Sequence, residues 1–357
     1  MKKPSLKWRK GKKAQQTPLS RITNETVAEH RERILAGGRR FKYPMQYARH
    51  KLVFNTIIIS LVALLLIIGI GWQQLYVAQN TGTFFYRVTK VLPLPVASID
   101  GQPVRYSDYL MNYRSSVHYL QQKEQVNLRD EQGQKQIEYI KNQALSDAVA
   151  DAYAVKLANE RDISISDEQI DAFIDQQRRS RDGTVSEETY DAVILDYYGW
   201  TPEEYREAMS NKLLRQEVAY HIDETAQSKR DAIATALEDN PDANFEDLAA
   251  KQGGEGVEQV TAGTSGMVPI NNQDGGLAEA ASQLEVGETS GAIKTTAGDG
   301  YYFVKLLETT DTQLSYAYIK VPLSEFAKRL QAAKDQDKLN PYISIPQLNA
   351  QRAPEQD

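Results

Sequence analysis

Leu52 to Trp72 form a run of 21 residues without a charged side chain, and the run separates two parts of opposite charge. Residues 1–51 hold 15 Lys/Arg and 3 Asp/Glu, whereas the other 306 residues hold 27 Lys/Arg and 45 Asp/Glu. A helix of about 20 apolar residues spans the hydrocarbon core of a bilayer, and excess Lys/Arg beside one end keeps that end cytoplasmic. We therefore expect a single-pass membrane protein, with a cytoplasmic N-terminus and a large extracytoplasmic part.

The apolar run at 52–72 is expected to be an uncleaved anchor rather than a signal peptide. A cleavable signal has an apolar region of roughly 7–15 residues and a small-x-small cleavage site. Here the run is longer, and the segment that follows it, Gln73–Asn80, has no good Ala-x-Ala sequence. The expected location is the cell membrane, with the C-terminal domains outside the cytoplasm.

The tail at 1–51 begins with a cluster of cations: Lys2, Lys3, Lys7, Arg9, Lys10, Lys12 and Lys13. Such a cluster can bind nucleic acid or anionic lipid headgroups. Because it lies on the basic side of the apolar run, a topology signal with lipid contact is the favoured interpretation. We expect no nucleic acid partner.

Composition argues against several classes of enzyme. The chain has no cysteine, which removes disulfides, thiolate metal sites and a Cys nucleophile. Of the four histidines, only His118 and His221 follow the apolar run, and they are too far apart in sequence to suggest a metal site. GxSxG, phosphate-loop and HExxH motifs are absent. We expect neither a metal nor a cofactor.

The first extracytoplasmic segments suggest a linker and then a helical domain. Residues 73–95 are expected to be a tether, because they contain Thr81-Gly82 and two prolines. Two short strands are predicted around Asp100-Gly101, a strong hairpin signal. Apolar and small residues then repeat over 135–160 with the spacing of a buried helix face.

Two capping boxes mark the starts of later helices. Ser166-Asp-Glu-Gln169 precedes one helix, and Thr201-Pro-Glu-Glu204 precedes another with Pro at its first position. The charged stretch between them, 178–186, is expected to be a loop. These signals predict an all-helical domain over 96–225.

The helical segments resemble a known family in their order and spacing. They read VASIDGQPVRYSDYL, ALSDAVADAYAVKLANERDISISDEQIDAFI and YYGWTPEEYREAMSNKLLRQEVAY. This set is similar to the N-terminal chaperone domain of SurA, PrsA and PpiD-type foldases over about 130 residues. The resemblance implies binding of unfolded or nascent exported polypeptides, whereas a generic helical bundle is the simpler alternative.

Residues 226–325 contain the segments NFEDLAAKQ, TSGMVPI and GGLAEAASQLEVGETSGAIKTTAGDGYYFVKLLET. Their order gives a resemblance to a parvulin-type prolyl isomerase domain. It implies an α+β domain with a small antiparallel or mixed sheet, and residues 326–357 are expected to form a helix and a tail. The whole fold class is then one transmembrane helix, an all-α SurA-N-like domain and an α+β parvulin-like domain.

The likeness is weakest at the residues that such isomerases use. Gln273 stands near the position of the pocket Met, Leu277 replaces the Phe, Thr264 lies near the Asp/Cys position and Tyr302 replaces a His. Tyr stays neutral until about pH 10, so the exchange of His for Tyr changes the titration of the site. Isomerase activity is expected to be weak or lost, and the catalytic residues stay unassigned.

The first parvulin strand has no clear counterpart before the helices, and AYHI at 219–222 more plausibly ends the preceding helix. A similar strand follows at 316–321, and we predict that 314–321 pairs with 301–307 and fills the first strand's place. Tyr318 then replaces the first His. The residues predicted to contact peptide are Met267, Leu277, Tyr302 and Tyr318.

The leading functional hypothesis is a membrane-anchored extracytoplasmic folding factor. It has two versions, an active prolyl isomerase and a holdase with a degenerate isomerase domain. A non-catalytic envelope scaffold or adaptor, with the basic tail as a docking arm, is the alternative. The sequence does not specify an oligomeric state.

Overall fold

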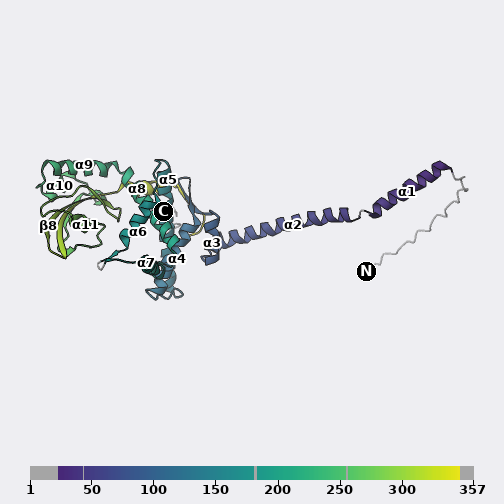
Figure 1. Ribbon diagram of the computed structural model, residues 1–357, viewed down its shortest axis with the longest axis horizontal. Helices are drawn as coiled ribbons and strands as arrows, with labels where there is room; N and C mark the ends of the chain where they lie inside the picture. Colours follow the sequence, from purple (N-terminus) through teal and green to yellow (C-terminus); the bar gives the residue numbers. More distant parts are fainter. Residues whose placement is uncertain (1–22, 43, 181–182, 255, 346–357) are drawn as a thin grey trace, which may run out of the picture. The chain divides into compact units, whose positions relative to one another are not determined.

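The computed structural model describes residues 23–42, 44–180, 183–254 and 256–345, and the chain divides into two compact units, residues 1–71 and 72–357 (Figure 1). The cation cluster predicted at Lys2–Lys13 lies outside the described residues.

The first unit consists of α1 (Asn24–Lys42) and most of α2 (Pro44–Trp72). A turn of π-helix, η1 (Gln73–Val77), continues α2. Within the described part of the chain, one helical stretch is long and apolar enough to cross a membrane: His50–Val77, which contains an 18-residue window with a mean hydropathy of 2.8 and no buried residue. Thr56 is accommodated in this stretch because its hydroxyl donates to the Leu52 carbonyl at 2.8 Å.

The second unit begins with a helical domain. Its helices are α3 (Thr83–Val91), α4 (Tyr106–Gln122), α5 (Glu131–Asn159), α6 (Asp167–Gln177), α7 (Glu187–Tyr198) and α8 (Pro202–Ile222). Both predicted capping boxes are present, with reciprocal bonds between Ser166 and Gln169 and between Thr201 and Glu204. A two-stranded hairpin, β3 (Arg179–Ser180) with β4 (Gly183–Thr184), lies in the stretch predicted as a loop.

Residues 73–95 are not a free tether, because they fold onto the helical domain. Leu75, Tyr86 and Thr89 are buried, and the Tyr106 hydroxyl donates to the Leu75 carbonyl at 2.6 Å. The Tyr86 hydroxyl donates to Glu204 at 2.7 Å. The prediction treated the prolines and Thr81-Gly82 as signs of a linker. Leu75 and Tyr86, however, pack into the core of the helical domain and attach the segment to it.

The end of the described chain returns to the same domain. After α12 (Glu325–Asp335), strand β10 (Leu339–Pro341) pairs antiparallel with β1 (Pro95–Ile99), which also pairs with β2 (Gln102–Arg105). The β1–β2 turn is the predicted Asp100-Gly101 hairpin, where both residues have positive φ. Leu339, Ile343 and Ile345 are buried in the helical core. The helical domain is therefore built from two stretches of chain that flank the α+β part.

The α+β part carries one antiparallel sheet in the order β5-β9-β8-β7, with β6 also paired to β9. Its elements are α9 (Glu224–Asp239), α10 (Phe245–Gln252), η2 (Gly256–Glu258), β5 (Thr261–Thr264), β6 (Val268–Pro269), α11 (Leu277–Ala281), β7 (Ile293–Lys294), β8 (Gly300–Thr309) and β9 (Gln313–Pro322). The predicted pairing of 314–321 with 301–307 is confirmed, since β8 and β9 form an antiparallel hairpin whose register shifts once, between Leu306 and Glu308. The predicted fold class is confirmed as well.

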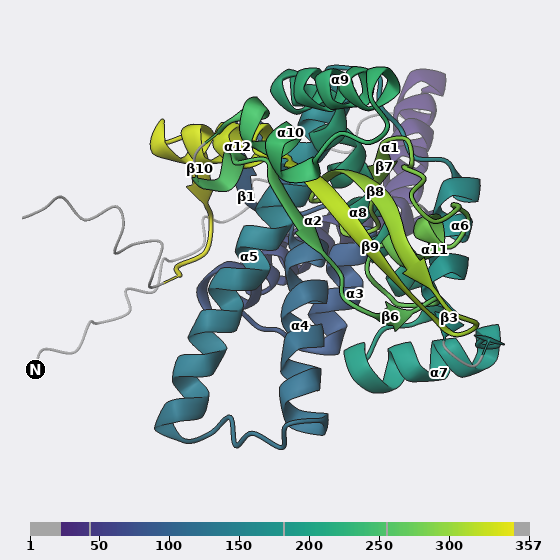
Figure 2. The same cartoon turned by 90° about the vertical axis from the view of Figure 1, so that its left-hand side faces the viewer.

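Each face of this sheet has its own core. Side chains alternate across a strand, so Tyr301 and Phe303 pack with α9 and α10, while Tyr302 and Val304 pack on the opposite face with α11. Figure 2 shows α9 and α10 next to the β8–β9 hairpin. The α11 face is the one that carries the residues predicted to bind peptide.

A buried carboxylate joins the two parts. Asp223, between α8 and α9, accepts the Ala226 amide at 2.9 Å and thereby caps α9. Its other oxygen accepts the amides of Ser324 and Glu325 at 2.8 and 3.0 Å, at the start of α12. Asp223 therefore fixes both chain connections between the helical domain and the α+β part.

Candidate peptide-binding site

Three of the four residues predicted to contact peptide lie together on the α11 face of the sheet. Tyr302 on β8 and Tyr318 on β9 have ring centroids 6.2 Å apart, and Leu277 belongs to the same cluster of apolar side chains. Met267 is 41% exposed, in the turn between β5 and β6, and does not belong to that cluster. We call Tyr302, Tyr316 and Tyr318 the tyrosine cluster.

Tyr302 is held by a carboxylate. Its hydroxyl donates to Asp299 Oδ2 at 2.9 Å, and the same carboxyl group accepts from Thr295 and Lys320. Burial, followed by the hydrogen bond to Asp299, raises the pKa of Tyr302 to about 12. Tyr302 is therefore a neutral phenol at physiological pH, and its hydroxyl proton is used in the hydrogen bond to Asp299.

Tyr316 was not predicted as a site residue, but it belongs to the same face. Its hydroxyl donates to Asp274 Oδ2 at 2.7 Å, and its ring centroid is 6.4 Å from that of Tyr318. Burial, and then the bond to Asp274, raises the pKa of Tyr316. A sequence signal existed, because positions 316 and 318 of a strand share a face. The acceptor Asp274, 42 residues away, had none.

Tyr318 lies across Gly263 of β5. A Cβ atom added at Gly263 would stand 2.8 Å from the Tyr318 hydroxyl oxygen, which is too close for a real side chain. Glycine at this position therefore lets the Tyr318 ring cover the β5 backbone. The neighbouring Thr264, near the predicted Asp/Cys position, pairs with Ala317 of β9.

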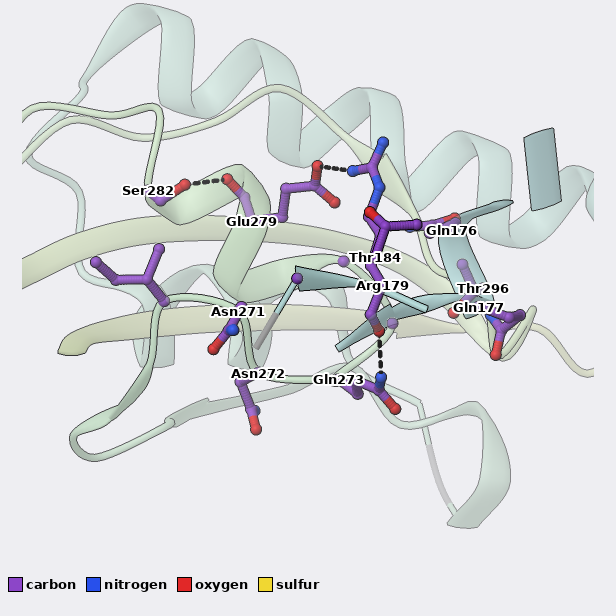
Figure 3. A pocket seen from close by; sticks show the side chains of 14 residues that line it. Gln176, Gln177, Arg179, Thr184, Asn271, Asn272, Gln273, Glu279, Ser282 and Thr296 are labelled. Atoms are coloured by element: carbon purple, nitrogen blue, oxygen red, sulfur yellow. Dashed lines mark hydrogen bonds and ion pairs between the residues drawn. The ribbon is translucent and has the colours of Figure 1, made fainter. Parts of the chain in front are cut away.

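A cavity of about 430 Å³ lies beside the cluster, between the α6–β3–β4 segment and the loop that precedes α11 (Figure 3). Five amide side chains line it: Gln176, Gln177, Asn271, Asn272 and Gln273. Gln273, which stands near the pocket Met position, donates from Nε2 to the Arg179 carbonyl at 2.7 Å. Arg179 also forms an ion pair with Glu279 at 2.5 Å. The cavity therefore has a polar wall.

The cavity and the tyrosine cluster are joined through the loop at 271–276. Asn272 lines the cavity and donates from Nδ2 to Asp274 Oδ2 at 3.0 Å, the oxygen that also accepts from Tyr316. Asp274 Oδ1 accepts the Ala278 amide at 3.0 Å, in the first turn of α11. One carboxylate thus positions α11, the cavity loop and the Tyr316 hydroxyl.

The chemistry available to this arrangement is hydrogen bonding and apolar contact. Two phenolic hydroxyls are already bound to carboxylates, and burial keeps both phenols neutral. Within the residues that the structure describes, no group of three or more His, Cys, Asp or Glu side chains could hold a metal ion. The amide wall and the aromatic rings are suited to an uncharged chain segment, because amides both donate and accept hydrogen bonds.

Two family models match this chain. One describes a SurA-like N-terminal domain and matches residues 45–219, and the other describes a PPIC-type PPIase domain and matches residues 190–321. A chaperone-type helical domain followed by a prolyl-isomerase-type domain defines a class of extracytoplasmic protein-folding factors. Within that class, the chain belongs to the SurA/PrsA/PpiD-type foldases.

A solved structure adds a distant likeness. It comes from work on PEB4 and Cj1289, described as two structurally related SurA-like chaperones in the human pathogen Campylobacter jejuni. The identity is 14%, the TM-score is 0.23, and the match covers 68% of this chain and 90% of the other. No curated protein matches this chain. The family assignment therefore follows from the two domain matches.

Proposed function

We propose that this folding factor is anchored by its apolar helix, with the N-terminus in the cytoplasm, and that it binds unfolded exported polypeptides with little or no isomerase activity. The anchoring is supported by the uncharged stretch and by the charge of +12 that precedes it, 15 cations against 3 acidic residues in 1–51. The polypeptide binding is supported by the SurA-like domain. The weak catalysis is supported by the tyrosine cluster.

One observation carries the catalytic part of the proposal. The pocket expected to bind the proline ring is occupied by the protein's own side chains. Leu277 and Tyr302 are each less than 10% exposed, and the Tyr302 hydroxyl is hydrogen-bonded to Asp299. Isomerisation must lower a barrier of about 18–20 kcal/mol, which requires an open apolar pocket around the ring and groups that favour a twisted amide. A filled pocket favours binding on its surface over turnover within it.

The proposed contact surface consists of Leu277 of α11, Tyr302 and Tyr318 of the sheet, and Met267 in the β5–β6 turn, and it is extended by the amide-lined cavity. Met267 adds a flexible exposed apolar side chain, a type that suits binding of varied sequences. The position of β9 between β5 and β8 supports our further proposal that β9 occupies the place of the first parvulin strand.

The test uses the full chain in lipid nanodiscs with two readouts. The first is the rate of cis–trans isomerisation of X-Pro peptides against a protein-free blank, and the second is suppression of aggregation of an unfolded client. We expect a blank-level rate together with suppression. Tyr302→Ala should weaken suppression, whereas the matched control Tyr197→Ala, at an exposed tyrosine of α7, should not.

Two results would overturn parts of this proposal. A rate above the blank that falls in Tyr302→Ala would establish a tyrosine-based isomerase. Failure to suppress aggregation, together with tight one-to-one binding of a single envelope protein, would establish a scaffold or adaptor instead.

A further inference from the structure

Helix α3 has one face that is firmly attached and one that is not. On the attached face, Tyr86 bonds to Glu204 and Lys90 pairs with Glu207 at 3.2 Å. The outward face carries Phe84, which is 70% exposed, and Val91, which is 81% exposed. This nine-residue helix therefore has apolar side chains on two faces, one packed against the core and one exposed.

The outward residues form a continuous stripe. Phe84, Arg87 and Val91 follow i, i+3, i+7 spacing and so lie on one side of the helix. Leu92 is exposed next to them. Among the described residues, Arg87 has no ion-pair partner. Single exposed apolar residues are normal on soluble proteins, but an aromatic, a cation and aliphatic residues in one stripe suit a membrane interface.

Chain continuity identifies the surface that this stripe can reach. The uncharged run ends at Trp72, and η1 (Gln73–Val77) continues it as a helical turn into the helical domain, where Leu75 is buried. Only residues 78–82 then separate η1 from the start of α3 at Thr83, and six peptide steps at about 3.5 Å each reach at most about 20 Å. If the uncharged run spans a membrane, α3 begins near the surface at which that run ends.

The connection is also folded rather than loose. The Tyr76 hydroxyl donates to the Pro95 carbonyl at 2.8 Å, and Gln79 donates to the Ser344 carbonyl at 2.7 Å. Arg114 donates to the Thr81 carbonyl and the Thr83 hydroxyl, both at 3.0 Å. These bonds fix residues 76–83 to the helical domain, so α3 keeps its place relative to the residues that directly follow the uncharged run.

We propose that the outer stripe of α3 lies in the headgroup region of the same bilayer, with Phe84 and Val91 inserted among the lipids and Arg87 at the lipid phosphates. The inference rests on the proposed membrane anchoring. Its consequence is that the helical domain has a defined orientation on the membrane, because a second contact prevents rotation about the single anchor.

The test uses single cysteines carrying a nitroxide label in the full chain, which has no native cysteine. The protein is placed in nanodiscs of phosphatidylcholine with phosphatidylglycerol, and each label is probed for collisions with oxygen, which concentrates in lipid, and with a water-soluble nickel chelate. The positions are Phe84 and Val91, Leu65 within the apolar helix, and Leu195, an exposed apolar residue of α7, as the matched control.

We expect the oxygen-to-nickel ratio at Phe84 and Val91 to exceed that at Leu195 several-fold, and Arg87→Glu to lower it. A ratio at Phe84 equal to that at Leu195, with Leu65 in lipid, would overturn this inference while leaving the anchoring intact. Shielding of Phe84 from both agents would assign the stripe to a protein partner and also overturn it. A nickel-accessible Leu65 would overturn the anchoring and the inference together.

Discussion

The side chain of Asp151 in the helical domain is 15% exposed, that of Asp299 in the α+β part is 40% exposed, and their pKa values move in opposite directions. Burial raises the pKa of Asp151 to about 6, against the opposing effect of Arg215, which pairs with it at 3.1 Å. Burial also opposes ionisation of Asp299, but hydrogen bonds from Lys320, Tyr302 and Thr295 outweigh it and lower its pKa. Asp299 is both less buried and bound by more donors than Asp151, and the two differences together favour its ionised form.

Removal of Arg215 should have the largest effect on this comparison. Arg215→Ala leaves Asp151 buried among Asp108 and Asp147 without its cation. We expect a loss of about 3 kcal/mol in the free energy of unfolding at pH 7, the low end for a broken buried pair. Urea denaturation would measure it. Arg206→Ala should cost less than about 1 kcal/mol, because its partner carboxylates Asp167 and Asp171 are 84% and 61% exposed; equal losses would contradict the comparison.

The pH dependence of Asp151 should be nearly as large. Because its folded pKa is raised from 3.8 to about 6, the stabilisation is complete below pH 4 and is lost as the pH rises through 6. The difference corresponds to about 3 kcal/mol. Asp151→Asn should remove this part of the dependence in denaturation curves between pH 4 and 7.

Asp108 provides the internal check on that experiment. Burial raises its pKa too, so a smaller dependence of the same sign should remain in Asp151→Asn. A variant curve identical to the parent curve would mean that Asp151 stays ionised throughout this range.

Tyr302→Phe should have a smaller effect, because it removes one of three donors from Asp299 and leaves the others in place. A hydrogen bond to a charged group contributes about 1.5–3 kcal/mol, and partial exposure of Asp299 points to the low end. Thermal and urea unfolding would measure the loss. Tyr318→Phe is the matched control, since its hydroxyl has no hydrogen bond among the described residues, and it should be nearly neutral.

The change in acid dependence caused by Asp299→Asn should be the smallest effect, and it comes in addition to the loss, at neutral pH, of the charge that accepts from Lys320, Tyr302 and Thr295. The lowered pKa of Asp299 means that its stabilisation is present above the unfolded value and is lost as the pH falls through the folded value. The variant should therefore lose less stability than the parent between about pH 4 and pH 2. Asp311→Asn, in the exposed β8–β9 turn, serves as control. A steeper acid loss in Asp299→Asn would contradict the assigned sign.

Local signals predicted local structure well. The hairpin at Asp100-Gly101, both capping boxes and the β8–β9 pairing depend on residues within a few positions of one another, and each is present. The tether at 73–95 was predicted wrongly, because the burial of Leu75 depends on Tyr106, 31 residues away. Propensity within the segment could not show that contact.

The site was predictable only where the parvulin resemblance placed residues. Tyr302 and Tyr318 were predicted together because each stands where such isomerases have a His, and the structure brings their rings to 6.2 Å between centroids. Their acceptors are less accessible to sequence reasoning, since Asp274 reaches Tyr316 through the fold of a loop. Met267 illustrates the converse: its residue type suggested a pocket, but its position in a turn leaves it exposed.

The pairing of β1 with β10 also has a consequence for the order of events during synthesis. Residues 95–99 leave the ribosome well before their partner at 339–341 is translated. The α+β part between them is contiguous and can fold while synthesis continues, as domains generally do. The helical domain, by contrast, must wait with an open sheet edge, and it is completed only after β10 has been translated.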